Sequence, residues 1–382
     1  MGKKIRVSKF WKNIFKNKPL MLLVIVLILA VVFSNPKTQQ YFNPTDSEAA
    51  TITEKFTMLR LTSATGVEQV LDIDTSGPKA LALVSNQGNN PGLFIHDLIA
   101  KTKTKLSTST TPYGRLTESL AVWNVDKGNG EGEIYYGNNN PLTGLKYKAV
   151  ANTPVDVSSA SLIAYVGKVG TTNKIVIHNV ATKVVQNQYI VVNYTPIGDP
   201  SRLNLRIAGG DWLYWTDKTS ASSKYGLFVY NIHTPNVAPR RVSFGYQTDV
   251  LSLEASGDIV VGRVRNSVGR DNIYTYDASA RKILGISNNS RVKSDPWIYN
   301  QNLIVYFDHY QANAAVSNQW TNRLVAYDFT TRTAAALYKW ITSTKETWSK
   351  PAFTYIYPKY YGVSAKIWNN GAQADVYGMV QN

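Results

Sequence analysis

The sequence predicts an all-β fold: a seven-bladed β-propeller, closed by an N-terminal outer strand and preceded by a single transmembrane helix. The ring is predicted by a two-residue pattern that recurs at intervals of 40 to 52 residues. In this pattern an aromatic residue or a histidine is followed by Asp, Asn or Gly. Tyr (24) and Trp (9) are abundant, and both suit the pleated surface of a sheet. A repeat of this length in a β-rich chain is typical of a ring of sheets.

The N-terminus predicts the transmembrane helix. Residues 1–18 contain seven Lys or Arg and no acidic residue, and residues 20–33 are apolar without interruption. As a helix this run is about 21 Å long, short of a bilayer core of roughly 30 Å, but no A-x-A-like cleavage site follows closely. We therefore predict a basic cytoplasmic leader (1–18), an uncleaved signal anchor (19–33) and an extracytoplasmic body, with a removed signal peptide as the alternative.

Residues 34–55 predict a linker, because they are mostly polar and contain two Asn-Pro pairs. The ring then occupies residues 56–382, which is about 47 residues for each of seven repeats. The chain ends three strands into the seventh repeat, while a strand-like segment at 56–62 precedes the first inner strand at 67–73. We expect segment 56–62 to supply the missing outer strand, which would close the ring and remove an open edge.

Within each repeat, the first strand is expected to begin near a proline, as at Pro200, Pro296 and Pro351. Apolar runs predict the second strands, at 80–84, 120–123, 162–165, 212–215, 259–261, 303–307 and 361–365. The repeated pairs end the third strands, where Asp or Asn can accept a backbone hydrogen bond and begin a turn. These pairs are His96-Asp97, Tyr136-Gly137, His178-Asn179, Tyr230-Asn231, Tyr276-Asp277, Tyr327-Asp328 and Tyr377-Gly378.

Two third-strand segments, LVAYDFTTRT at 324–333 and LFVYNIHTPN at 227–236, resemble the repeat of TolB-like β-propellers. The shared pattern is V-Y-D-x-x-T-G-K, and the inner strands that follow Asp-Pro are similar too. The resemblance covers nearly all of residues 56–382 and implies the propeller architecture, but it implies no particular activity. The chain departs from the pattern at Gly137 and Gly378.

Composition excludes several kinds of chemistry. The chain has no cysteine, so it has neither disulfides nor thiolate ligands nor a cysteine nucleophile. The four histidines are scattered, and no HExxH, GxSxG or P-loop pattern occurs. We therefore predict no catalytic residue, no metal and no cofactor. Without the leader the body carries 34 basic and 25 acidic residues, a net charge of +9. This charge is compatible with anionic glycans or anionic lipid head groups, or with a surface that is merely solvated; the basic residues are too dispersed to predict nucleic-acid binding.

The candidate binding residues lie in segments that follow second strands and look like long polar loops, above all 126–132 and 308–322. Loops after second and fourth strands share one face of a propeller, so this face is expected to carry the ligand. Aromatic side chains on projecting loops are typical anchors for partners. The predicted site residues are Asp308, His309, Tyr310, Trp320, Asp126 and Glu131.

These features predict a membrane-anchored interaction or scaffold module of a cell envelope or virion surface, which binds protein or glycan and is not an enzyme. The alternative is an exported hydrolase or lyase that acts on polysaccharide with Asp126, Glu131 or Asp308 around the central mouth. Glycoside hydrolysis needs two carboxylates that face each other across a cleft. Such a pair would favour the enzyme, whereas scattered and solvated acids would favour the binding module.

Overall fold

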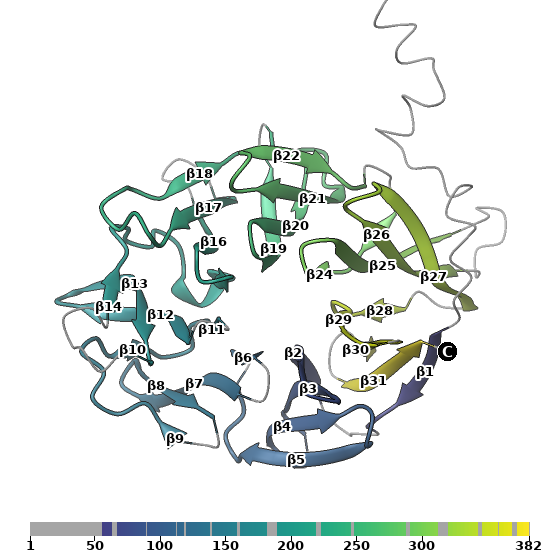
Figure 1. Cartoon of the computed structure of the whole chain (residues 1–382), viewed down its shortest axis with the longest axis horizontal. Helices are drawn as coiled ribbons and strands as arrows, with labels where there is room; N and C mark the ends of the chain where they lie inside the picture. Colours follow the sequence, from purple (N-terminus) through teal and green to yellow (C-terminus); the bar gives the residue numbers. More distant parts are fainter. Residues whose placement is uncertain are drawn as a thin grey trace, which may run out of the picture.

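The computed structural model describes residues 56–381, except for 63–66, 89, 112, 118–119, 138–139, 159–160, 182–188, 219–222, 246–247, 288–290, 312–319, 343–345, 358 and 369–372. Antiparallel sheets are arranged in a ring around a central axis, so the all-β propeller fold is confirmed (Figure 1). The first sheet contains β2 (Glu68–Ser76), β3 (Lys79–Asn86), β4 (Gly92–Asp97) and β5 (Thr102–Ser107), in that order outwards from the axis.

Three further sheets repeat this plan. One contains β15 (Arg206–Ala208), β16 (Trp212–Lys218), β17 (Tyr225–Asn231) and β18 (Arg240–Val242). The next contains β19 (Asp249–Ser256), β20 (Ile259–Arg265), β21 (Asp271–Asp277) and β22 (Lys282–Gly285). In the third, β23 (Val292–Lys293) and β24 (Trp297–Tyr299) both pair with β25 (Leu303–Gln311), which β26 (Trp320–Asp328) and β27 (Thr333–Thr342) follow. All seven predicted second strands lie within strands of the structure.

The predicted count of seven separate blades is not confirmed. Among the described residues, five sheets of four or five strands stand apart, and the predicted second and third repeats share one nine-stranded sheet. That sheet contains β6 (Gly114–Thr117), β7 (Leu120–Gly128), β8 (Glu131–Tyr136), β9 (Asn140–Pro141), β10 (Ala149–Val150), β11 (Val155–Val157), β12 (Leu162–Val169), β13 (Thr172–Asn179) and β14 (Tyr189–Val191). The two halves are joined because the short strand β10 pairs with both β8 and β12.

The N-terminal strand closes the ring, as predicted. The last sheet contains β28 (Thr347–Trp348), β29 (Ala352–Ile356), β30 (Lys359–Trp368) and β31 (Gln373–Gln381), and β1 (Phe56–Arg60) is its outermost strand. β1 runs antiparallel to β31, with Phe56 opposite Gln381, and Figure 1 shows the purple and yellow strands side by side. The two ends of the described chain are thus held in one sheet.

The repeated pairs have the predicted local role in most repeats. Six of them end a third strand, whereas Tyr377-Gly378 lies inside β31. The Asp97 carboxylate accepts hydrogen bonds from the backbone N–H groups of Ile99 and Ala100, and Asp328 holds the turn after β26 in the same way. These side chains turn the chain towards the outermost strand.

The proline prediction holds at two of three positions. Pro296 and Pro351 directly precede β24 and β29. Pro200 instead opens the 3₁₀-helix η3 (Pro200–Arg202), and β15 begins only at Arg206. The Asp199 side chain accepts a hydrogen bond from the Ser201 backbone N–H, so it caps the helix that the proline starts.

The apolar core lies between neighbouring sheets rather than on the axis. Trp215 and Phe228, from β16 and β17, stack with ring centroids 5.7 Å apart and pack against Ala164 and Ile177 of the preceding sheet. Burying a side chain of this size contributes about 2–3 kcal/mol. Because the cores lie between sheets, the axis itself is left to the inner edges of the first strands and to polar side chains.

The predicted membrane anchor is not supported. No helix among the described residues is long and apolar enough to cross a membrane. The leader (1–18), the signal anchor (19–33) and the linker (34–55) lie outside the described residues. The predicted localisation, a single-pass membrane protein with an extracytoplasmic propeller, therefore has no support in the described part of the chain and is withdrawn.

Candidate functional site: a cationic cavity on the ring axis

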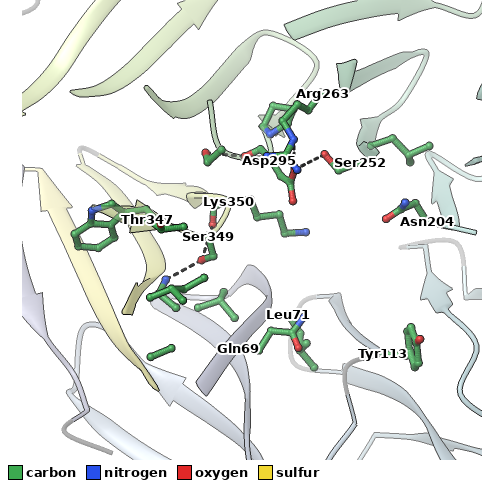
Figure 2. Close-up of a pocket in the computed structure, with 18 of the residues that line it drawn as sticks. Gln69, Leu71, Tyr113, Asn204, Ser252, Arg263, Asp295, Thr347, Ser349 and Lys350 are labelled. Atoms are coloured by element: carbon green, nitrogen blue, oxygen red, sulfur yellow. Dashed lines mark hydrogen bonds and ion pairs between the residues drawn. The ribbon is translucent and has the colours of Figure 1, made fainter. Parts of the chain in front are cut away.

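A cavity of about 620 Å³ lies on the ring axis. Its walls come from the inner ends of all the sheets and from the segments that lead into the inner strands, and Figure 2 shows the labelled side chains arranged around the open centre. Cavities of this size hold small ligands or a few sugar units. A ligand on the axis would therefore be in contact with every sheet of the ring.

Cationic groups dominate the charged lining. Five Lys or Arg side chains line the cavity and two carboxylates do so: Arg115, Arg206, Arg263, Lys293 and Lys350 against Glu68 and Asp295. Neutral polar groups and two large aromatic side chains complete the wall, among them Gln69, Asn204, Ser252, Ser349, Tyr113 and Trp348. The lining can thus offer hydrogen bonds, aromatic surface and positive charge to one ligand.

Arg115 reaches from the inner strand β6 to three other parts of the ring. Its guanidinium nitrogens lie 3.6 Å from Asp72 of β2, 3.5 Å from Asp156 of β11 and 3.4 Å from Glu254 of β19. It also donates a hydrogen bond of 3.2 Å to the carbonyl of Leu71. All four charged side chains are buried, so one cation holds together inner strands from separate repeats.

The carboxylates of this cluster also serve the backbone. The inner edge of each first strand has N–H groups that no further strand can pair, and a buried unpaired N–H is costly. Asp72 accepts a 2.8 Å hydrogen bond from Leu116 N–H, and Asp156 accepts one of 2.7 Å from Ile207 N–H. Each aspartate therefore fastens its own inner strand to the next one.

Glu254 is the carboxylate on which the cavity cations converge. Its Oε1 lies 2.6 Å from Nε of Arg206, and its Oε2 lies 2.7 Å from Nζ of Lys350 and 3.4 Å from Arg115. Glu254 is 4% exposed, whereas the side chains of Arg206 and Lys350 are 13% and 15% exposed. Arg206 and Lys350 therefore lie between the buried carboxylate of Glu254 and the cavity.

Burial raises the pKa of both aspartates in this cluster. Desolvation raises the pKa of Asp72 to about 6 and that of Asp156 to about 7, since it outweighs the attraction of Arg115. Nearby Glu254 raises both values further, while the hydrogen bonds from Leu116 and Ile207 oppose the rise. Both carboxyls therefore exchange protons close to neutral pH.

We expect the Asp156→Asn variant to gain stability relative to the wild type as the pH rises from 6 to 8. A carboxyl whose pKa is about 7 when folded and about 4 when unfolded binds its proton more tightly in the folded state. Its stabilising contribution is complete below pH 4 and is lost as the pH rises through 7. The loss amounts to about 1 kcal/mol between pH 6 and 8, measured by urea denaturation at both values.

The comparison with the variant is needed because burial lowers the pKa of His96 to about 4, and this histidine changes stability in the opposite direction at the acidic end. The difference between wild type and variant cancels that effect. Asp199→Asn is the matched control, because hydrogen bonds from Ser201 lower the Asp199 pKa and its contribution is constant over this range. An equal difference at both pH values for Asp156→Asn would contradict the assignment.

The wall formed by β20, β23 and β24 carries the other charged lining groups. Nε of Arg263 lies 3.0 Å from Asp295, which accepts a 2.7 Å hydrogen bond from the Ser252 hydroxyl; Figure 2 shows both contacts. Nζ of Lys293 donates to the carbonyls of Asp271 and Arg291 at 3.2 and 2.8 Å. Burial lowers the pKa of Lys293 to about 8.

The predicted site residues at 308–322 do not form a loop. β25 continues to Gln311 and β26 begins at Trp320, so Asp308, His309 and Tyr310 belong to one arm of a hairpin and Trp320 to the other, while 312–319 lie outside the described residues. The ladder continues because polar residues pair across it, as Asp308 does with Arg323 at 2.7 Å. The guanidinium of Arg291 lies 4.1 Å from the ring centre of Tyr310.

Only part of the predicted site reaches the cavity. Asp308 is buried in its ion pair, and of the six predicted residues only His309 lines the cavity. Asp126 and Glu131 lie on another sheet, in the β7–β8 hairpin, where Asp126 accepts a hydrogen bond from Asn152 and Glu131 pairs with Lys148 at 2.9 Å. The acids that the enzyme alternative requires are therefore not brought together at the central mouth.

None of the charged residues on the axis is among the site residues predicted from the sequence. They recur on inner strands with the period of the repeat: the intervals between Asp72, Arg115, Asp156, Arg206 and Glu254 are 43, 41, 50 and 48 residues. A search for charged residues in phase with the third-strand pairs would have found them. Asp72 instead looks like part of a turn, because Asp74, Ser76 and Gly77 follow it.

Comparisons with known proteins give the fold but no family. No family model and no curated protein matches the chain. Among solved structures, an oligogalacturonate lyase in complex with manganese matches with a TM-score of 0.56 at 10% identity, over 85% of this chain and 93% of the other. The β-propeller domain of the trilobed protease from Pyrococcus furiosus, described as having an open velcro topology, matches with a TM-score of 0.52 at 9% identity, over 83% and 94%.

TolB from Acinetobacter baumannii matches with a TM-score of 0.38 at 12% identity, over 81% of this chain and 78% of TolB. The propeller part of the predicted resemblance is confirmed by the ring of sheets and by the similarity to the propeller domain of the trilobed protease, whereas a narrower tie to TolB is not. The similar structures include a lyase and peptidases, and at such low identity the fold alone does not decide whether this chain is an enzyme. Within the described residues, no three His, Asp or Glu side chains are grouped so that they could hold a metal ion.

Proposed function

We propose that the ring is a glycan-binding module and that its axial cavity holds an acidic oligosaccharide. The observation that carries this proposal is the charge of the cavity lining, which contains five cationic side chains and two carboxylates. Lys350 is the central element: in Figure 2 its side chain extends from the wall into the open centre, and this side chain remains partly exposed although its Nζ pairs with Glu254. A carboxylate on the ligand would gain charge-assisted hydrogen bonds there.

The neutral lining supports a sugar rather than a peptide. The Asn204 amide and the Ser252 and Ser349 hydroxyls lie around the same centre as Lys350, and such groups match the hydroxyls of a sugar ring (Figure 2). Tyr113 and Trp348 add aromatic surface, which suits the apolar faces of sugar rings. The oligogalacturonate named in one similar structure is a chain of sugar acids, and it provides a probe of this class.

We expect the full-length protein to bind trigalacturonate in isothermal titration calorimetry and to bind its fully methyl-esterified form at least tenfold more weakly. Esterification removes the charges and keeps the sugar rings, and one charge-assisted hydrogen bond contributes about 1.5–3 kcal/mol. Lys350→Met should weaken the binding of trigalacturonate by about tenfold to a hundredfold for the same reason.

The control is Lys282→Met, which removes the same charge from the outermost strand β22, where Lys282 is exposed. It should leave the affinity unchanged, and circular dichroism should show that both variants are folded. Equal affinity for the acid and the ester would contradict an anion site. Equal loss in both variants would indicate that only the overall positive charge attracts the ligand.

A further inference from the structure

We propose that the axial cavity binds its anionic ligand together with protons, which Asp72 and Asp156 take up beneath it. This inference rests on the proposed function and adds to it a regulation of the same site by pH. It follows from the way in which one cation, Arg115, belongs both to the cavity wall and to the buried carboxylate cluster.

The geometry links the two regions through shared charges. Arg115, Arg206 and Lys350 line the cavity, and all three also contact Glu254. Arg115 in addition contacts both aspartates, at 3.5 and 3.6 Å. A change in charge on either aspartate therefore alters the positive potential that the same guanidinium presents to the cavity.

A count of formal charges shows the size of the effect. The five cationic lining residues are opposed by Glu68 and Asp295 in the lining and by Asp72, Asp156 and Glu254 beneath it, so the site is neutral when every carboxyl is ionised. A proton on each of Asp72 and Asp156 leaves the site with a net charge of +2. The site therefore attracts an anion more strongly when these carboxyls are neutral than when they are ionised.

The two aspartates are suited to this exchange. Arg115 is 3.5–3.6 Å from both carboxylates, and desolvation raises their pKa values more than the attraction of Arg115 lowers them. The resulting pKa values, about 6 and 7, lie near neutrality. Arg115 and Glu254 act on both aspartates, Lys350 acts on Asp72, and Asp72 in turn raises the pKa of Asp156. The N–H groups of Leu116 and Ile207 complete their surroundings. An anion in the cavity adds negative potential, which raises both values further, so protons from solvent bind to the carboxylate oxygens.

Other titratable groups line the cavity as well. They include the carboxyl of Glu68, whose pKa burial raises, the imidazole of His309, and the amine of Lys293, whose pKa burial lowers to about 8. A proton on any of them adds positive charge or removes negative charge, so each would strengthen anion binding in the same direction. Substitution of the aspartates therefore has to accompany any pH profile.

The experiment is titration of full-length protein with trigalacturonate at pH 6, 7 and 8, at each pH in two buffers with different ionisation enthalpies. The carboxylates of the ligand stay ionised over this range. We expect the dissociation constant to rise about five- to tenfold from pH 6 to pH 8, with net proton uptake near pH 7. In Asp72→Asn/Asp156→Asn, binding should persist while most of its pH dependence and most of the proton uptake near pH 7 are lost.

The outcomes separate this inference from the proposed function. No binding of trigalacturonate at any pH would remove the proposed function itself. Binding with the same affinity at pH 6 and 8 and with no proton uptake would overturn the proton linkage alone. The linkage is also overturned if proton uptake is undiminished in the double aspartate variant, because Glu68, His309 or Lys293 would then be its source.

Discussion

Replacement of Arg115 by methionine is expected to destabilise the protein by about 3–5 kcal/mol at pH 8. Methionine keeps much of the side-chain volume but leaves Asp72, Asp156 and Glu254 buried with fewer positive partners. The loss should show as a lower midpoint in urea denaturation. It should be smaller at pH 6, where Asp156 is largely protonated and Asp72 about half protonated, so that the two carboxyls need less compensation.

The matched control is Arg265→Met. Arg265 forms a 2.7 Å ion pair with Asp271, but its side chain is 48% exposed. Exposed ion pairs contribute about 0–1 kcal/mol, so this variant should be almost as stable as the wild type. Similar losses for the two variants, or a loss at Arg115 that does not depend on pH, would contradict the role of Arg115 as the buried counter-ion of both aspartates.

Deletion of residues 56–60 is expected to abolish the single cooperative unfolding transition of the ring. β1 is the outer strand of the sheet that contains the C-terminal strand β31, so its loss opens the closure and exposes an unpaired strand edge. We expect a broad urea transition with a lower m-value, together with aggregation in light scattering. A sharp transition that merely shifts by the burial of one strand would show that closure is unimportant.

A point variant isolates the packing of that strand. Phe56 is 4% exposed, and its ring meets Phe353 edge-on with centroids 5.7 Å apart. Phe56→Ala should therefore cost about 3–5 kcal/mol, whereas Thr57→Ala, at an exposed position of the same strand, should cost less than about 0.5 kcal/mol. Equal midpoints for the two variants would place the contribution of β1 in backbone pairing alone.

The sequence was sufficient to predict the strands because their signals are local. An Asp or Asn at the end of a third strand, such as Asp97 or Asp328, forms hydrogen bonds with its own turn, and this depends only on neighbouring residues. The closing strand was predictable from counting, since the last repeat lacked one strand. The prediction failed where a pairing depends on distant residues. β10, which joins β8 to β12, consists of Ala149 and Val150 only, and two residues are too few to show a strand pattern.

The site was harder to predict for the same physical reason. Polar residues such as Asp308 and Tyr310 resemble loop residues in sequence, yet they extend a hairpin because their partners lie on β26. Glu254 and Arg115 are 139 positions apart, and their contact exists only because the ring brings separate inner strands to one axis. A single sequence shows that such residues are charged, but not that they converge.

The most direct test of ligand binding on the ring axis is a crystal structure of the protein with trigalacturonate bound at pH 6. We expect the ligand in the axial cavity, with one carboxylate within hydrogen-bond distance of Nζ of Lys350 and sugar hydroxyls near Asn204 and Ser252. A ligand bound to the outer strands, or an axial cavity that remains empty at saturating ligand, would contradict the proposal that the axis is the binding site.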